Sequence, residues 1–368
     1  MKDLEKKMVF MGGPRQCGKT TLSKELIQKK IKSGLYFNYD SDEDRREMLA
    51  KRWHVDNQLI VLDEIHKYYR WKNWIKGIYD TRPSSQKFLI TGSARLDLYR
   101  RGGDSLLGRY HYWRLHPFTL SENPLKLKSE AALDRFMRFG GFPEPYLDGD
   151  ETFARRWRKD RFDRVIRDDL RDLEPIKNIS ALTLFVEMLR TRVGSPIVLN
   201  HIAADLQVSQ ATLKHWLEIL EHMYLIFIVR PFTKNLARAI QKPPKVFFFD
   251  NADVIGDDGA VFENLVATHL VKKVHFLEDS TGYRYALHYV RDKEHREVDF
   301  VVTQDGNPVE LIEAKYADPQ IASALNYFAR KLNVHSAHQV VGKLKRPYSS
   351  GKIHVERATH FLSASVWK

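Results

Sequence analysis

The feature that most constrains this chain is a glycine-framed turn near its start, set between a short apolar run and a helical pattern. Gly13 and Gly18 enclose four residues and are followed directly by Lys19 and Thr20. This spacing lets successive backbone N–H groups surround a phosphate at the N-terminus of a helix. The apolar run before the turn and the amphipathic pattern after it are the context that a P-loop requires, so the segment predicts a strand, a phosphate-binding loop and a helix.

A P-loop implies particular contacts with ATP and Mg²⁺. Lys19 is expected to reach the β- and γ-phosphates, and the hydroxyl of Thr20 is expected to ligate Mg²⁺. Cys17 has no base partner nearby in the sequence, so we interpret it as a small residue that fits beneath a phosphate. The predicted nucleotide contacts of the loop are Gly13, Pro14, Arg15, Gln16, Cys17, Gly18, Lys19, Thr20 and Thr21.

A second apolar run, from Leu59 to Leu62, ends in the acids Asp63 and Glu64. Such a run is typical of a buried parallel strand, whose carboxyl end lies at the ligand-binding edge of the sheet. Asp63 is therefore expected to hold the water shell of Mg²⁺, and Glu64 to polarise the water that attacks the γ-phosphate. The alternative is that both acids are solvated and open a loop.

Two further residues are predicted to contact the nucleotide. The apolar strand that begins at Lys87 ends in hydroxyl residues, of which Ser93 or Thr91 can sense the γ-phosphate or serve as a turn residue. Arg109 follows a glycine turn and precedes an aromatic strand. It is expected to stabilise transition-state charge on its own nucleotide or on a neighbour's, or else to lie over the aromatic side chains.

Composition sets the broad class of the protein. The 368 residues suffice for two or three domains, and 60 Lys+Arg against 47 Asp+Glu give a net charge of +13. This excess favours a polyanionic partner such as DNA. No apolar run is long enough for a membrane helix, and the first residues lack the apolar core of a signal peptide, so a cytoplasmic protein without a membrane partner is expected.

The middle of the chain carries a winged-helix pattern. Two helices joined by a tight turn run from Leu199 to Leu220, and the strand Tyr224 to Val229 follows them. The stretch from Met223 to Phe249 contains basic residues and no acid, which predicts that it grips phosphates. Packing or protein contact is the alternative for such a module. Its basic residues are Arg230, Lys234, Arg238, Lys242 and Lys245.

The last third of the chain carries an ordered set of acids. Glu313 and Lys315 lie two residues apart on a predicted strand and therefore share a face. If the preceding strand is its neighbour, Asp299 approaches Glu313, and Glu263 on the helix before these strands completes a Mg²⁺ site. That site is predicted to cleave phosphodiesters, with Lys315 orienting the water or offsetting negative charge. The alternative is a set of strand-end acids paired with Lys315 and Arg296 on an exposed face.

Taken together, these motifs resemble a bacterial and archaeal family of AAA-type ATPases with a C-terminal domain of formerly unknown function. The resemblance implies an α/β fold of three parts: a P-loop AAA-type core, a helical and winged-helix middle, and a restriction-endonuclease-like domain of the PD-(D/E)XK type. The expected ranges are 1–125, 126–250 and 251–368. In that type the metal-binding acids and the lysine correspond to Asp299, Glu313 and Lys315.

The resemblance also bears on function. DNA processing, including that of branched DNA, is the usual proposal for such proteins, and AAA relatives often form rings. We therefore expect an ATP-hydrolysing protein that acts on DNA, with Glu64, Lys19, Asp299, Glu313 and Lys315 as the catalytic set. The alternative is a nucleotide-dependent switch that binds a protein partner and carries an inactive nuclease-like fold.

Overall fold

The computed structural model describes residues 2–31, 33–92, 106–169, 178–233 and 242–364. Contacts divide the chain into two compact units, one of residues 1–117 with 222–224 and the other of residues 118–221 with 225–368. The first unit contains the predicted P-loop. The second contains both the helical middle and the C-terminal strands.

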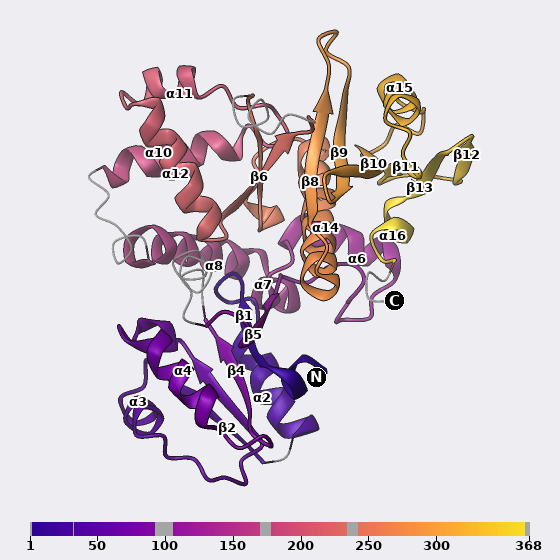
Figure 1. The fold of residues 1–368 in the computed structure, drawn as a ribbon. Helices are drawn as coiled ribbons and strands as arrows, with labels where there is room; N and C mark the ends of the chain where they lie inside the picture. Colours follow the sequence, from indigo (N-terminus) through magenta and orange to yellow (C-terminus); the bar gives the residue numbers. More distant parts are fainter. Residues whose placement is uncertain (1, 32, 93–105, 170–177, 234–241, 365–368) are drawn as a thin grey trace. The chain divides into compact units, whose positions relative to one another are not determined.

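The first unit is built on a parallel sheet of five strands in the order β2-β3-β4-β1-β5 (Figure 1). All neighbouring strands are parallel, so their carboxyl ends meet at one edge. Strand β4 lies between β1 and β3 and therefore between the phosphate loop and Asp63. The strands are β1 (Met8–Gly12), β2 (Gly34–Asn38), β3 (Leu59–Asp63), β4 (Lys87–Thr91) and β5 (Tyr110–Arg114).

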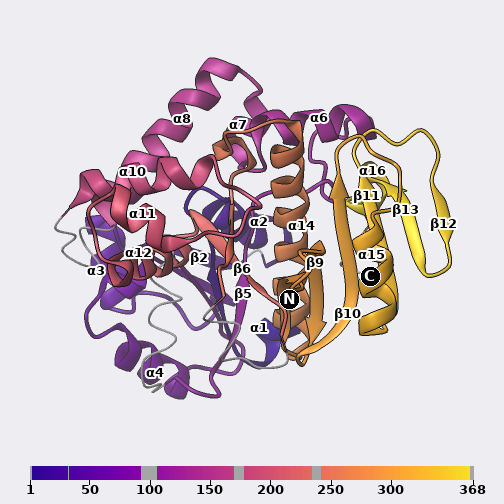
Figure 2. The ribbon, with the colours of Figure 1, turned by 90° about the horizontal axis from the view of Figure 1, so that it is seen from above.

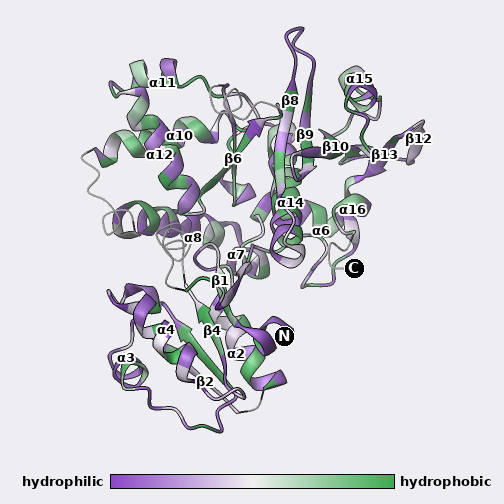
Figure 3. Ribbon diagram, viewed as in Figure 1, coloured by the Kyte–Doolittle hydropathy of each residue, from purple (hydrophilic) through white to green (hydrophobic). Residues whose placement is uncertain are grey.

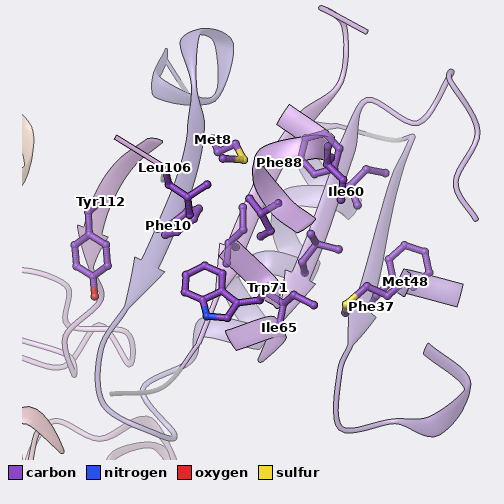
Figure 4. Close-up of a cluster of buried hydrophobic side chains, with 14 residues drawn as sticks. Met8, Phe10, Phe37, Met48, Ile60, Ile65, Trp71, Phe88, Leu106 and Tyr112 are labelled. Carbon is purple, nitrogen blue, oxygen red and sulfur yellow. The ribbon is translucent and has the colours of Figure 1, made fainter. Parts of the chain in front are cut away.

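Both faces of this sheet are covered, which explains why its central strands are mostly apolar (Figure 3). Alternate residues pack against α3 (Asp42–Leu49) and α4 (Trp71–Thr81) on one face. Figure 4 shows this cluster, in which the rings of Phe10 and Trp71 lie 6.1 Å apart. The residues between them pack against α1 (Lys2–Lys6) and α2 (Lys19–Lys30) on the other face.

The second unit begins with helices. They include α6 (Ser129–Phe139), α7 (Pro143–Asp148), α8 (Glu151–Arg164), a π-helical turn at Val165–Asp169, α10 (Ile179–Arg190), α11 (Leu199–Asp205) and α12 (Gln210–His222). The predicted helix pair from Leu199 to Leu220 is confirmed. Its second helix buries Leu213, Trp216, Leu217 and Leu220, and leaves Gln210, Lys214 and His215 exposed. Strand β6 (Ile226–Pro231) follows and pairs antiparallel with β7 (Lys245–Phe248).

A mixed sheet of eight strands in the described part continues from this pair, in the order β12-β13-β11-β10-β9-β8-β6-β7. Helices α14 (Asp258–Thr281) and α15 (Ser323–Leu332) lie on either side of β9 and β10 (Figure 2). The short α16 (Ala358–Phe361) follows the last strand. The further strands are β8 (Tyr285–Arg291), β9 (Glu297–Gln304), β10 (Asn307–Lys315), β11 (Ser336–Val341), β12 (Tyr348–Ser350) and β13 (Ile353–Arg357).

Strands β9 and β10 are antiparallel neighbours. The predicted approach of Asp299 to Glu313 required these strands to be neighbours. Within the part of the chain that the structure describes, no helix combines the length and the apolar character needed to cross a bilayer. The structure is thus a mixed α/β protein whose first sheet has the layout of a P-loop core.

Candidate functional site

The phosphate loop connects β1 to α2 and relies on left-handed backbone conformations. Gly13 and Gly18 have φ angles of 138° and 97°. A Cβ on Gly13 would lie 2.2 Å from the carbonyl oxygen of Leu115, so no other residue fits there without a shift of the backbone. Because α2 begins at Lys19, the first free N–H groups of that helix face the loop. The loop thus has the conformation that its glycine spacing predicts.

Lys19 is 8% exposed and turns back into the loop. Its Nζ donates to the carbonyl oxygens of Gly13, at 3.0 Å, and Pro14, at 2.5 Å. Both partners are neutral, so they leave the positive charge of the ammonium uncancelled. Cys17 is buried beneath the loop and donates to the carbonyl oxygen of Leu115 at 3.6 Å, which agrees with its interpretation as a small packing residue.

Asp63, at the end of β3, receives hydrogen bonds from hydroxyl groups of three different elements. Thr20 on α2 donates to Oδ2 at 3.1 Å, and Thr91 on β4 donates to Oδ1 at 2.5 Å. Tyr36 on β2 also donates to Oδ2. Burial and the neighbouring Asp63 carboxylate raise the pKa of Tyr36 above its usual range, so the phenol stays protonated. Asp63 is 6% exposed, yet all three of these partners are neutral.

Glu64 lies beside this carboxylate in a left-handed conformation, with φ of 56°. Its backbone N–H donates to the carbonyl oxygen of Thr91 at 2.9 Å, which fixes the turn that directs the side chain. Burial raises the pKa of Glu64, and the ammonium of Lys67, at 3.4 Å, opposes that shift. A strained residue with a perturbed carboxyl at the edge of a parallel sheet is typical of a functional acid or base.

The other predicted nucleotide contacts have different outcomes. Pro14, Arg15 and Gln16 lie in the loop and Thr21 lies in the first turn of α2, whereas Ser93 falls outside the described residues. The positive charges of Arg15 and Lys19 oppose the rise that burial causes in the pKa of Glu64.

The structure does not bring Arg109 to the phosphate loop of its own chain. Arg109 precedes β5, whose first residue pairs with the first residue of β1, while the loop follows the last residue of β1. The length of β1 separates them by about 13 Å, at about 3.3 Å per residue. The guanidinium of Arg109 instead pairs with both carboxylate oxygens of Asp80, at 2.8 and 3.1 Å. This position favours a role for Arg109 other than contact with its own nucleotide, which remains a prediction.

Lys19, Thr20 and Asp63 fit ATP and Mg²⁺ at the edge of the first sheet. The loop offers backbone donors and a lysine, and Thr20 and Asp63 offer the oxygen ligands that Mg²⁺ prefers. Sequence reasoning missed Tyr36, because only the pairing of β2 with β3 brings it to Asp63. Thr91, weighed against Ser93 as a sensor, is the hydroxyl residue that the structure places beside Asp63.

The predicted acids of the last third also come together, in the second unit. The backbone N–H of Asp299 donates to Oε2 of Glu313 at 3.3 Å, and that of Ala314 donates to Oδ2 of Asp299 at 3.0 Å. Lys315 pairs with Oε1 of Glu313 at 2.8 Å. Glu313 is 4% exposed, which excludes the alternative of acids on an exposed face. Arg296 does not take part and pairs with Asp292 instead.

One member of this cluster was not predicted. Lys245, on β7, is 1% exposed and directs its Nζ into the cluster. The Nζ lies 2.8 Å from Glu297, 3.3 Å from Glu263 and 3.6 Å from Asp299. The prediction that Lys245 grips phosphates together with the neighbouring basic residues is therefore wrong, because this lysine is buried. Lys234 and Arg238 of that group fall outside the described residues.

The electrostatics of the cluster follow from burial and crowding. Burial, together with the charge of Asp299, raises the pKa of both Glu263 and Glu313 to about 7. Burial by itself would lower the pKa of Lys245, but the carboxylates of Glu263, Asp299 and Glu297 outweigh it and raise that pKa above its usual range. The lysine therefore carries its charge inside the protein.

The predicted metal ligands Glu263, Asp299 and Glu313 are close in space, and each already has partners within the protein. Both oxygens of Asp299 and both oxygens of Glu313 have partners within the protein. Over the described residues, no group of three or more His, Cys, Asp or Glu side chains is arranged to hold a metal ion. The Mg²⁺ ion of a nuclease does not fit this arrangement.

Comparison with family models divides the chain into three matched stretches. A model described as an AAA domain matches residues 5–123. Two further models, each described as a domain of unknown function, match residues 130–252 and 258–359.

Two relatives match most of this chain. An uncharacterized protein of Methanocaldococcus jannaschii is 26% identical over 353 residues, covering 86% of this chain and 76% of its own. An uncharacterized protein of Mycobacterium tuberculosis is 23% identical over 334 residues, covering 86% of this chain and 72% of its own.

Among solved structures, two variants of RuvB from Thermotoga maritima align at 17% and 18% identity, each covering 60% of this chain and 81% of its own. Their TM-score of 0.29 is too low to establish a common arrangement. The family model and the loop geometry agree: residues 5–123 match an AAA domain, and the part of the chain that contains the phosphate loop is an AAA-type, ATPase-like domain.

Proposed function

We propose that this protein binds ATP with Mg²⁺, hydrolyses it, and uses the hydrolysis to work on DNA. The observation that carries the ATP part is the meeting of Lys19, Thr20 and Asp63 at the carboxyl edge of a parallel sheet. A phosphate loop, a hydroxyl ligand and a strand-end carboxylate are the parts that P-loop enzymes combine.

Each residue has a distinct task in this proposal. Lys19 exchanges its bonds to the carbonyl oxygens of Gly13 and Pro14 for bonds to the β- and γ-phosphates. Thr20 and Asp63 hold Mg²⁺, which offsets the negative charge of the phosphate oxygens when bound. Glu64, whose pKa is raised by burial, orients the attacking water and accepts its proton.

The DNA part rests on charge and on the helical region. The chain carries a net charge of +13, and the pair α11–α12 followed by antiparallel β6 and β7 is consistent with a winged helix. The exposed face of α12 carries Gln210, Lys214 and His215, side chains able to contact phosphates or base edges. The restriction-endonuclease-like identity of the α14-to-β11 region belongs to the same proposal, as does assembly into a ring.

ATP hydrolysis with and without DNA tests this proposal. Purified protein is assayed in Mg²⁺ with duplex, single-stranded and branched DNA, and phosphate release is measured. We expect DNA to stimulate hydrolysis, and we expect Lys19→Ala to abolish it while the exposed Lys29→Ala on the same helix leaves it unchanged. Equal hydrolysis by Lys19→Ala and the unsubstituted protein would refute the ATP part.

A nucleotide-dependent switch that binds a protein partner is the second candidate. The internal pairing of the C-terminal acids favours it, because such a cluster has a structural use without any chemistry on DNA. The salt dependence of DNA affinity separates the two candidates. Contacts with several phosphates make log K fall steeply with log salt. The absence of such a slope, with ATP hydrolysis intact, would select the switch.

A further inference from the structure

We propose that Lys245 is the resident cation of the C-terminal acid cluster. Its ammonium group takes the place of a divalent metal among Glu263, Glu297 and Asp299, so this domain binds no catalytic metal and does not cut DNA. The inference rests on the proposed nuclease-like fold of the domain. It is independent of ATP hydrolysis and of DNA stimulation.

The first argument is the position of the charge. Nζ of Lys245 lies within 3.6 Å of carboxylates from two elements, Glu263 on α14 and both Glu297 and Asp299 on β9. A metal bridging these carboxylates would share oxygen ligands with the ammonium and lie within a few ångströms of it. Two cations at that separation repel strongly in a buried site. Occupation by the lysine therefore opposes occupation by a metal.

The second argument is the satisfaction of the remaining oxygens. Oδ2 of Asp299 and Oε2 of Glu313 accept backbone N–H groups, and Oε1 of Glu313 accepts from Lys315. Glu297 also pairs with Arg291 through its second oxygen, at 3.4 Å. A metal needs carboxylate oxygens with open lone pairs directed at one point. Here the protein's own donors hold these groups.

The third argument is that Lys245 is fixed in place. Its strand β7 pairs with β6, where Val229 lies opposite Lys245, and Pro196 forms a further bridge to Lys245. The N–H of Phe248 on the same strand donates to Asn264 of α14 at 2.8 Å. Lys315, whose side chain is 38% exposed, has solvent to turn into, whereas the 1% exposed Lys245 does not.

Crowding on the acid side supports the same assignment. A Cβ on Gly194 would lie 2.5 Å from the Glu263 carboxylate, so the backbone there closes over that group. A buried cluster of acids without a cation is strongly destabilised, because each charge loses its hydration. Lys245 supplies a compensating positive charge from within the chain, at the place where a metal would otherwise supply it.

Manganese binding tests the proposal in the full-length chain. An Asp63→Asn background removes the expected ion site of the AAA domain, nucleotide is omitted, and free Mn²⁺ is followed by electron paramagnetic resonance. We expect this parent to bind no stoichiometric Mn²⁺. Adding Lys245→Met should create a Mn²⁺ site whose affinity is at least about tenfold higher than any residual affinity of the parent, because the repelling charge is gone. The exposed Lys242→Met is the matched control and should behave as the parent.

Two results would overturn the proposal. One is a parent chain that binds one Mn²⁺ and loses it upon Asp299→Asn, and the other is a folded Lys245→Met variant that binds none. If that variant does not fold, comparison of the parent with Asp299→Asn still decides. The same pair is tested for DNA cleavage in Mg²⁺ and Mn²⁺, where no cutting is expected and Asp299-dependent cutting would refute the proposal. Failure of ATP hydrolysis affects none of these readouts.

Discussion

The two sites of this protein combine the same kinds of residue, a buried lysine and an aspartate, in opposite ways. In the first unit Lys19 is held by backbone carbonyl groups, and Asp63 by the hydroxyls of Thr20, Thr91 and Tyr36. In the second unit Lys245 is held by carboxylates, and Asp299 is one of its partners.

The difference is one of charge. Neutral partners orient Lys19 and Asp63 without cancelling their charges, so both remain available to a phosphate and a divalent ion. Ionic partners in the second unit cancel one another, which stabilises the cluster but leaves little charge for a ligand. Burial of a lysine among acids is therefore no sign of catalysis by itself. The charge of its partners decides whether the lysine remains available to a ligand.

The largest expected effect concerns Glu64. Glu64→Gln should keep ATP binding and lower the rate of hydrolysis by roughly 10²- to 10⁴-fold, because the amide cannot accept the proton of the attacking water. Phosphate release gives the rate, and a fluorescent ATP analogue gives the affinity. The exposed Glu25→Gln is the control. A rate within threefold of the unsubstituted enzyme would assign the base to another residue.

The two buried lysines are expected to differ in their importance for stability, since Lys245 stabilises the fold and Lys19 serves activity. Lys245→Met is expected to lower the free energy of unfolding by about 3–5 kcal/mol, since it leaves three half-buried carboxylates without their cation. Lys19→Met should change it by less than about 1 kcal/mol, because only carbonyl groups lose a partner that water can replace. Urea unfolding followed by circular dichroism measures both, and equal losses would contradict the contrast between the two sites.

A buried histidine makes the second unit sensitive to acid. Burial lowers the pKa of His269 to about 4, and its Nε2 accepts the N–H of Leu120 at 2.9 Å. The imidazole takes up a proton more readily in the unfolded chain than in the folded protein. The contribution of His269 to the free energy of unfolding therefore falls as the pH drops from about 6.5 towards 4. We expect it to remove about 2 kcal/mol of stability between pH 7 and pH 5.

The effect of His269 is isolated by comparing the free energy of unfolding of the unsubstituted protein with that of His269→Gln. Glu263 and Glu313 are present in both proteins, and their raised pKa values change the stability with pH in the opposite direction. The glutamine retains an acceptor for Leu120 but does not titrate in this range. Urea unfolding at the two pH values measures the difference. Parallel pH profiles for the two proteins would show that His269 is not responsible.

The smallest expected effect is that of Arg109→Ala. Since Arg109 lies at the opposite edge of the sheet from its own phosphate loop, hydrolysis per chain should be unchanged at high dilution. Phosphate release is measured over a range of protein concentrations. A deficit at every dilution would show that the residue acts on its own nucleotide, and a deficit that grows with concentration would assign it to the nucleotide of a neighbouring chain.

Sequence reasoning worked where the determining pattern is local. The loop around Gly13 and Gly18 and the apolar strand before Asp63 are visible as short spacings, and both are found as predicted. The proximity of Asp299 and Glu313 needed one assumption about neighbouring strands, which the antiparallel pairing of β9 with β10 confirms. A hairpin-like connection makes that assumption natural, because adjacent strands commonly pair.

The tertiary structure alone decided the partners of these groups. Tyr36 reaches Asp63 because β2 is the neighbour of β3. Lys245 reaches Asp299 although β6 and β8 lie between β7 and β9 in the sheet, and a hydrogen bond from Phe248 to Asn264 ties β7 to α14. No spacing in the sequence encodes these contacts, since they depend on the order of strands and on which side chains are buried. The sequence determined which chemical groups the protein has, whereas burial and strand order decided which charges stay available.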